Sequence, residues 1–347
     1  MAEFILHDYR IISLNNMKRF YNICFLALAI LSLTSCFKED TQIIPIEIQQ
    51  ETIPHSMYEY QTYYSITDSA IVSYNHYADW DLGFESSDEG YHIILNTARY
   101  MYAGNTLNTD FESIKSGQNT KMYFDHSSGN LDSTVFIDWV DLTIQSNPVF
   151  NQYVYVVDRG KDESGEAFGL KKIVFEKMEN DTFYIHFANL DNSEEYYFQV
   201  PKDPTVNFTL FSFDDGGKFI ASEPDKTAWD ICFTKYSTVI PDDFGTPTDY
   251  LVRGVFLNSF KNIEVALDTV NYFYEILPEN INDYSYSTAR DAIGYDWKVF
   301  SDDVYQIRDY NSYILKNVNG FNYKLRFTNF YNESGEKGYP SFELIEL

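Results

Sequence analysis

The side chains best suited to bind a transition metal are unevenly distributed along the chain. Histidine, methionine and cysteine offer imidazole, thioether and thiolate ligands to iron, copper and zinc. Residues 203–347 contain neither His nor Met, and their one cysteine is Cys232. A site built on His or Met therefore lies before residue 203. The candidates beyond residue 36 are His55, His76, His92, His126, His186, Met57, Met101, Met122 and Met178.

The sequence lacks the motifs of common catalytic centres. It has no Gly-x-Ser-x-Gly elbow, no His-Glu-x-x-His motif, no phosphate-binding loop and no Cys-x-x-Cys pair. The acidic residues are numerous, and no sequence spacing specifies a glycosidase pair among them. Asp81 and Asp230 each follow a Trp, and we expect them to orient a neighbouring strand through backbone hydrogen bonds. The protein is predicted not to be an enzyme.

Residues 17–35 have the pattern of a bacterial lipoprotein signal peptide. Lys18 and Arg19 precede a mostly apolar run over 20–33, which is shorter than the roughly 20 residues of a membrane span. The run ends in Leu-Thr-Ser-Cys, so we expect cleavage before Cys36 and lipidation of its thiol. The alternative is a signal anchor that is never cleaved.

This interpretation divides the N-terminal part of the chain into segments and predicts where the protein is located in the cell. Residues 1–16 are predicted to be a mis-called upstream extension, because Met17 suits the start of the signal peptide. Residues 36–56 are predicted to form a lipidated tether that anchors the protein to the outer membrane. Residues 37–40 read Phe-Lys-Glu-Asp, which is similar to the surface-export signal of Bacteroidota lipoproteins. The protein is expected to face the cell exterior.

Charge and cysteine content narrow the possible partners and compartments. The 347 residues carry a formal net charge of −27, and loss of residues 1–35 makes this −28. Such a chain is not expected to bind nucleic acid, because that affinity comes from Lys and Arg on phosphates. Cys24 leaves with the signal peptide and Cys36 carries lipid, so Cys232 is the one remaining thiol. No disulfide can form within the mature chain, and stability must come from core packing.

Sequence landmarks recur in the same order in two halves of the chain. The two Trp-Asp pairs at 80–81 and 229–230 are the clearest of these. We therefore predict a tandem pair of similar units, 57–202 and 203–347. The matching segments are 63–66 with 210–213, 80–84 with 229–233, 93–96 with 255–258, Trp139 with Trp297, and 172–175 with 324–327.

The landmarks have the pattern of β-strands. In 229–234 the residues Trp, Ile and Phe alternate with Asp, Cys and Thr, and 80–85 repeats this alternation. A period of two places one row on a core and the other towards solvent or a neighbouring strand. The content of 30 Tyr and 28 Phe also suits pleated sheets. The predicted fold is all-β and mostly antiparallel, with helical turns only over 285–293 and near Phe111.

The sequence resembles the HmuY family of Bacteroidota surface lipoproteins. The resemblance is carried by the two Trp-Asp-apolar-x-Phe strands and by Ile-Gly-Tyr-Asp-Trp-Lys at 293–298. It is also carried by a closing segment that includes Tyr-Lys-Leu-Arg-Phe at 323–327 and Gly-Glu-Lys-Gly at 335–338. It covers the chain from about residue 208 to the end, and more loosely from about residue 60. The family implies an all-β fold and haem capture for iron acquisition at the cell surface.

The resemblance also indicates where haem ligands belong. In the founding type of the family a His follows the Trp-Asp strand, and the matching positions here are Glu85 and Thr234. His126 lies roughly where the family can place its other ligand, and some relatives use Met. The haem-ligand candidates are therefore His126, Met101 and Met122.

Two non-enzymatic functions remain for a chain with these features. The first is a haem- or porphyrin-binding surface lipoprotein that delivers haem to an outer-membrane receptor. The second is a surface binding or scaffold module without haem, in which aromatic-rich sheets recognise glycan, peptide or a partner protein. An apolar slot with a ligand at its mouth favours the first, and a flat exposed platform of Tyr and Trp favours the second.

Overall fold

The computed structural model describes residues 51–317 and 319–347. The predicted signal peptide, the lipidation site Cys36 and most of the tether lie outside these residues. The predicted all-β fold is confirmed, because the described chain consists of antiparallel sheets joined by loops and short 3-10 turns. No helix within the described residues is long and apolar enough to cross a membrane.

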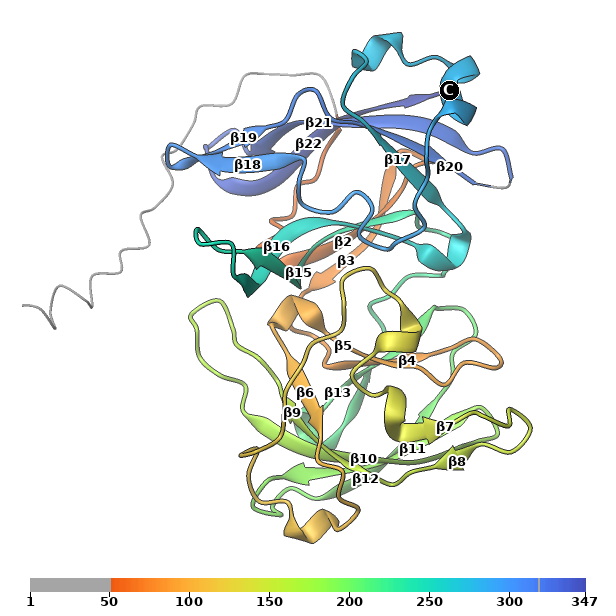
Figure 1. Cartoon of the computed structure of the whole chain (residues 1–347), viewed down its shortest axis with the longest axis vertical. Coiled ribbons are helices and arrows are strands. Elements are labelled where there is room, and N and C mark those ends of the chain that lie inside the picture. Colours follow the sequence, from red (N-terminus) through yellow and green to blue (C-terminus); the bar gives the residue numbers. More distant parts are fainter. Residues whose placement is uncertain (1–50, 318) are drawn as a thin grey trace, which may run out of the picture. The chain divides into compact units, whose positions relative to one another are not determined.

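The strands form two groups of sheets, which we call lobe 1 and lobe 2 (Figure 1). Lobe 1 consists of β4(Leu82–Glu85), β5(Ile93–Leu95), β6(Tyr102–Asn105), β7(Val140–Asp141), β8(Val149–Phe150), β9(Val154–Asp158), β10(Leu170–Glu179), β11(Thr182–Asn189), β12(Tyr196–Pro201), β13(Phe208–Ser212) and β14(Lys218–Ile220). Its main sheets have the orders β14-β13-β4-β5 and β12-β11-β10-β9-β6.

Lobe 2 repeats this plan with different strands. It consists of β1(Glu51–Thr52), β2(Tyr60–Ser65), β3(Ala70–His76), β15(Ile231–Pro241), β16(Pro247–Leu257), β17(Glu264–Asp268), β18(Lys298–Ser301), β19(Val304–Ile307), β20(Ser312–Lys316), β21(Asn322–Tyr331) and β22(Lys337–Glu346). Its main sheets have the orders β16-β15-β2-β3 and β1-β22-β21-β20-β17.

Eight short 3-10 helices interrupt the loops of the described chain. They are η1(Thr97–Arg99), η2(Phe111–Ser113), η3(Leu131–Ser133), η4(Ile137–Trp139), η5(Asp214–Gly216), η6(Ser259–Lys261), η7(Phe273–Glu275) and η8(Pro278–Asp283). The predicted helical turn near Phe111 is present as η2. The one predicted over 285–293 is wrong, because Ser287 instead exchanges backbone hydrogen bonds with Val265 at the edge of β17.

Each predicted unit contributes its first hairpin to the other lobe. The hairpin β2–β3 precedes residue 203 but pairs with β15, where Tyr64 is opposite Ile231. The hairpin β13–β14 follows residue 203 but pairs with β4, where Leu210 is opposite Gly83. Figure 1 shows β2 and β3 beside β15 and β16, and β13 beside β4 and β5. The boundary proposed at 202/203 is therefore not a boundary between the two lobes.

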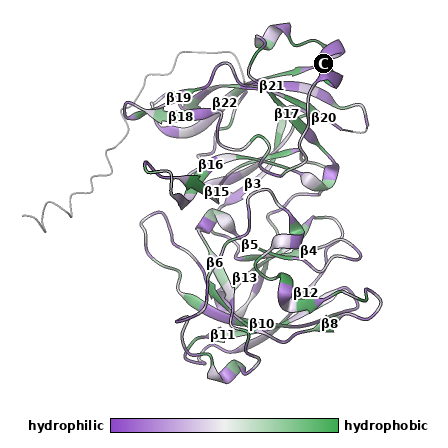
Figure 2. Cartoon of the chain, in the orientation of Figure 1, coloured by the Kyte–Doolittle hydropathy of each residue, from purple (hydrophilic) through white to green (hydrophobic). Residues whose placement is uncertain are grey.

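Each lobe has its own aromatic core, and the exchanged hairpins belong to those cores. Phe211 of β13 packs with Phe84 and Phe187 in lobe 1. Tyr64 of β2 packs with Phe233 and Phe342 in lobe 2. Figure 2 shows hydrophobic residues concentrated along the strands, with hydrophilic residues commoner in the connecting loops.

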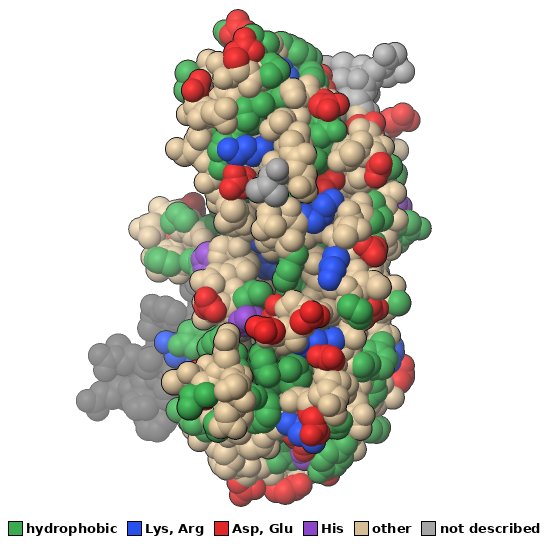
Figure 3. Space-filling model, turned by 90° about the vertical axis from the view of Figure 1, so that its right-hand side faces the viewer, with side chains coloured by type: hydrophobic (Ala, Val, Ile, Leu, Met, Phe, Trp, Pro, Cys, Tyr) green, Lys and Arg blue, Asp and Glu red, His purple; other side chains and the backbone are tan. Residues whose placement is uncertain are grey.

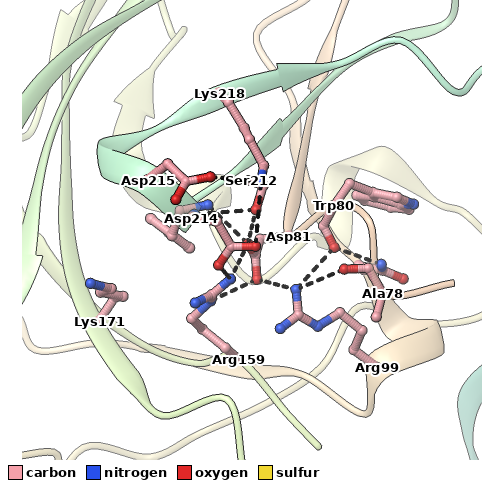
Figure 4. Close-up of polar contacts among 12 residues, drawn as sticks. Ala78, Trp80, Asp81, Arg99, Arg159, Lys171, Ser212, Asp214, Asp215 and Lys218 are labelled. Atoms are coloured by element: carbon pink, nitrogen blue, oxygen red, sulfur yellow. Dashed lines mark hydrogen bonds and ion pairs between the residues drawn. The ribbon is translucent and has the colours of Figure 1, made fainter. Parts of the chain in front are cut away.

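Asp81 and Asp230 hold the exchanged strands in place, as predicted. The Asp81 carboxylate accepts a hydrogen bond of 2.9 Å from the Phe213 amide, and Asp230 accepts one of 2.7 Å from the Ile66 amide. Asp81 also binds the Arg99 and Arg159 guanidinium groups at 2.7 and 2.8 Å (Figure 4). Because Asp81 and Arg99 are fully buried, each compensates the charge of the other.

Matching contacts recur in the two lobes. The Asn96 side chain donates to two carbonyl groups, those of Tyr77 and Trp80, and Asn258 donates in the same way to Lys226 and Trp229. Lys172 of β10 and Lys324 of β21 each donate to two carbonyl groups of a 3-10 turn and its end. The same contacts are therefore made at matching positions of the two lobes, and the duplication stays a prediction.

Both faces of the two Trp-Asp strands are buried. The alternation predicted that one row of side chains lies in a core, and the structure shows that the other row is buried as well. In β15 the side chains of Ile231 and Phe233 lie in the core of lobe 2, while Cys232 packs against Tyr63 and Trp229 on the other face. In lobe 1 the second face carries a matching cluster, whose buried members are Trp80, Ile94, Phe208 and Leu210. These second faces line a cavity that is described below.

Candidate functional site

A histidine and a carboxylate meet at the end of the strand pair β4–β5. Glu85 ends β4, and its amide donates to the carbonyl of His92, which directly precedes β5. The connecting loop turns at Gly90, where an added side chain would clash with the Glu85 carboxyl group. Glycine is therefore needed for the carboxylate to fold back under the loop.

The Glu85 carboxylate holds the His92 ring in one orientation. His92 Nδ1 lies 2.5 Å from Glu85 Oε2, and the Ser87 hydroxyl donates to Glu85 Oε1 at 2.6 Å. Burial alone would raise the pKa of Glu85, but the hydrogen bonds from His92 and Ser87 outweigh it and lower this pKa. The carboxylate is thus charged, and His92 Nδ1 is its hydrogen-bond partner.

His92 also lines a cleft of about 560 Å³. His92 Nε2 lies 3.9 Å from an oxygen of Asp132, which also lines the cleft and is 92% exposed. The apolar part of the lining consists of Tyr91, Ile93, Ile137, Trp139, Val140 and Leu142. The volume lies within the range of about 300–1,000 Å³ that is usual for cofactor and small-molecule sites.

Buried contacts of Trp139 hold one wall of the cleft in place. Trp139 is buried, and its indole N–H donates to the Tyr91 carbonyl at 2.9 Å. The Trp139 ring also stacks on Phe150 with centroids 5.3 Å apart. The wall that carries His92 and Tyr91 is therefore preorganised.

These residues fit one side-chain ligand for a haem iron. A metal-binding imidazole usually donates its second N–H to a carboxylate, which orients the ring and raises its basicity. Glu85 makes this contact with His92, so Nε2 is the nitrogen available for coordination. The lining contains Asp132, Asp138 and Asp141 but no Lys or Arg, so the cleft offers no cationic partner to haem propionates. Within the described residues no group of three His, Cys, Asp or Glu side chains could hold a bare metal ion.

The three predicted ligands lie elsewhere, and the structure does not bring them together. His126 is exposed, and its Nδ1 contacts the Ser128 hydroxyl at 2.9 Å. Met101 is fully buried in the core of lobe 1, and Met122 is half-buried. None of them lines the His92 cleft. Their role as ligands stays a prediction.

The two positions that match the family's histidine have different surroundings. At the first position, Glu85 forms a hydrogen bond with His92. A histidine ring therefore lies next to the position where the founding type has its own histidine. Thr234 is buried in β15 and accepts a hydrogen bond from Gln61 Nε2 at 3.0 Å. The sequence did not single out His92, because this residue lies seven positions after Glu85, across a hairpin whose register the sequence does not reveal.

Comparisons with known proteins point to one family. The family model described as HmuY protein matches residues 57–344. No curated protein matches the chain. A solved structure described as an HmuY-like heme binding protein from Bacteroides vulgatus is 16% identical, with 49% of this chain and 96% of that chain covered. Its TM-score is 0.17, too low to inform the arrangement of the lobes.

Proposed function

The chain belongs to the HmuY family, and on this basis we propose that it binds haem or a related porphyrin in the His92 cleft. The observation that carries the proposal is His92 in the cleft wall, with the Glu85 carboxylate held against its ring. His92 would supply a nitrogen ligand, Glu85 would orient the imidazole ring, and Tyr91 and Leu142 would form part of the apolar wall around the group. A bound haem supplies the iron that the uptake system acquires.

We place this binding activity on a surface lipoprotein that is anchored through Cys36 and serves iron acquisition. The lipobox pattern that ends at Cys36 and the acidic residues after it support this location. An outer-membrane receptor would then take the haem from the cleft. Loss of the protein from the membrane fraction in a Cys36→Ser variant would support the anchor, and unchanged membrane association would contradict it.

A haemin titration of the soluble chain from Phe37 onward tests the proposal. We expect a saturable Soret change at about one haem per chain. The His92→Ala variant should bind at least about tenfold more weakly, because it loses the nitrogen ligand. His76→Ala is the matched control, since His76 lies on β3 and does not line the cleft.

Two further variants locate the ligand. Glu85→Gln keeps the shape of the side chain but removes its charge, and we expect about tenfold weaker binding with an altered Soret position. Loss of the Soret change in His126→Ala or Met101→Ala, with His92→Ala unaffected, would overturn the His92 assignment but keep haem binding. No saturable change in oxidised or reduced protein would overturn the haem proposal.

The haem-independent alternative has one observation in its favour. Tyr74 on β3 is 53% exposed and stacks on His55 with ring centroids 3.7 Å apart. Tyr60 contacts both rings and extends this aromatic surface. All four Trp side chains are buried, so the surface has no Trp platform within the described residues. Tyr74 is the first residue to substitute if haemin fails to bind.

A further inference from the structure

A second cavity, of about 100 Å³, lies between the second faces of the two Trp-Asp strands. It is separate from the His92 cleft, because the two share no lining residue. Six aromatic side chains line it together with aliphatic and polar residues; the aromatic ones are Tyr63, Trp80, Phe208, Trp229, Phe256 and Phe260. A dry engineered cavity of about 150 Å³ can hold benzene, so this space suits a ligand of a few heavy atoms.

The cavity wall contains a buried N–H group without an acceptor. Trp229 is 7% exposed, and its indole Nε1 has no hydrogen-bond partner. The equivalent Trp80 donates to Gln61 Oε1 at 2.9 Å. In the matched repeats Phe208 stands where Gln61 stands, so the phenyl ring leaves the Trp229 N–H unpaired. The Gln61 carboxamide shows which kind of group, an sp² oxygen, satisfies a Trp N–H in this setting.

The same cavity contains a guanidinium group that forms no direct ion pair, and the charges of Asp125 and Asp291 act on it only from a greater distance. Arg290 lines the cavity with its Cζ 4.2 Å from the Phe256 ring centroid. Its Nε donates to the Ser127 carbonyl at 3.4 Å, and neither terminal nitrogen has a hydrogen-bond partner among the described residues. Asp125 accepts from two backbone amides and Asp291 accepts from Ser127, and neither forms an ion pair with Arg290.

The remaining charges of the lining do not oppose an anion. Burial raises the pKa of Glu223 to about 8, so its carboxyl group is mainly neutral at pH 7. Burial also raises the pKa of the Cys232 thiol, which stays protonated. Lys235 already contacts the Tyr58 carbonyl and Glu163. The charged groups of the cavity lining are therefore the cations Arg290 and Lys235. The chain as a whole has a net charge of −27, and its acidic side chains are spread over the face seen in Figure 3.

We propose that this cavity is a binding site for a small carboxylate with a short apolar tail. Arg290 and the Trp229 N–H would bind the carboxylate oxygens, and the aromatic walls would cover the tail. A guanidinium group presents paired donors that match a carboxylate. Asn207 Oδ1, buried and also unpaired, offers an acceptor for a hydroxyl group on the ligand.

Binding of sodium butyrate to the full soluble chain tests the proposal, with neutral butyramide as the comparison. In the ¹⁵N-labelled protein we expect the Trp229 indole N–H resonance to shift saturably with butyrate, while Trp139 and Trp297 stay unchanged. Butyramide should bind at least about tenfold more weakly, because it lacks the charge that Arg290 recognises. Equal binding of the two probes, or no saturable shift, would overturn the proposal.

Variants test the assigned residues. Arg290→Gln should weaken butyrate binding at least about tenfold, and Trp229→Phe should weaken it while keeping an aromatic wall. Arg326→Gln is the matched control, because Arg326 pairs with Glu343 outside the cavity. If Arg290→Gln fails to fold, the comparison of butyrate with butyramide on the wild-type protein still tests whether the cavity recognises a carboxylate. His92→Ala should bind butyrate normally, so failure of the haem proposal leaves this one intact.

Discussion

At the scale of the residue, Glu223 links stability to pH. Its carboxyl group accepts hydrogen bonds from the Asn207 and Phe208 amides, and burial raises its pKa to about 8. In the unfolded chain the pKa is about 4.3. Between these values the folded protein keeps a proton that the unfolded chain has lost, so the free energy of unfolding falls as pH rises.

We therefore expect the Glu223→Gln variant to lose part of this pH dependence. Its free energy of unfolding should decline less than that of the wild type between pH 5 and pH 8, by roughly 3–4 kcal/mol. Urea unfolding at a series of pH values measures the difference. Asp125, whose pKa is raised by burial to about 6, is present in both proteins and cancels in the comparison. Parallel pH profiles of the two proteins would contradict the assignment.

Residue types predicted some of these roles and not others. Asp81 and Asp230 were recognisable because each follows a Trp on an alternating strand, where a carboxylate can reach neighbouring amides. The Glu85–His92 pair was not, because it depends on how the loop around Gly90 returns. The isolated Trp229 N–H was also hidden, since it depends on Phe208 standing where the other repeat has Gln61, and the sequence does not show that this position faces the indole N–H.

At the scale of the element, the Asp81 carboxylate joins three segments of lobe 1. It binds Arg99 at the end of η1, Arg159 just after β9 and the backbone after β13 (Figure 4). Asp230 makes the equivalent contacts in lobe 2 with Lys261 at 2.5 Å, which is partly exposed. The charge in lobe 1 is therefore less accessible to solvent than its counterpart.

Asp81→Ala should cost about 3–5 kcal/mol of unfolding free energy, because it leaves the buried Arg99 without a counter-charge. Asp230→Ala should cost less, since water can solvate Lys261. Asp215→Ala is the control and should cost under about 1 kcal/mol, because its ion pair with Lys218 is exposed. Urea denaturation measures all three. An equal loss for Asp81→Ala and Asp215→Ala would contradict the role of the network.

Local patterns predicted individual strands better than their partners. The strand at 82–85 and the first part of β15, at 231–234, follow from alternation and β-forming side chains. The pairing of β2 with β15 and of β13 with β4 cannot be predicted from local patterns, because the two hairpins are similar and either one would fit either lobe. In the 285–293 segment a tertiary contact overrides the local preference for a helical turn, since Ser287 forms a β-bridge with Val265 at the edge of β17.

At the scale of the whole molecule, the exchanged hairpins make each lobe depend on both halves of the chain. Lobe 1 needs Phe211 and Phe213 from beyond residue 203 to complete its core. Lobe 2 needs Tyr64 and Ile66 from before it. A tandem pair of independent domains would have neither requirement.

This dependence predicts how the two halves behave when they are made separately. The fragment 57–202 should be largely unfolded, because it lacks β13 and leaves the apolar residues of β2 without a partner sheet. The fragment 203–347 lacks β2 and should behave likewise. Mixed in equal amounts, the two should form a folded one-to-one complex, since all the sheet partners except the two-residue edge strand β1 are then present.

Circular dichroism and size-exclusion chromatography of each fragment and of the mixture measure this outcome. A cooperative unfolding transition should occur in the mixture only. If 57–202 alone unfolds cooperatively with a near-ultraviolet aromatic signal, its own hairpin can replace β13–β14, and the exchange is then not required for folding. The His92 cleft gives a second readout, because β4 needs β13 as its neighbour. Haemin binding should therefore return only when both fragments are present.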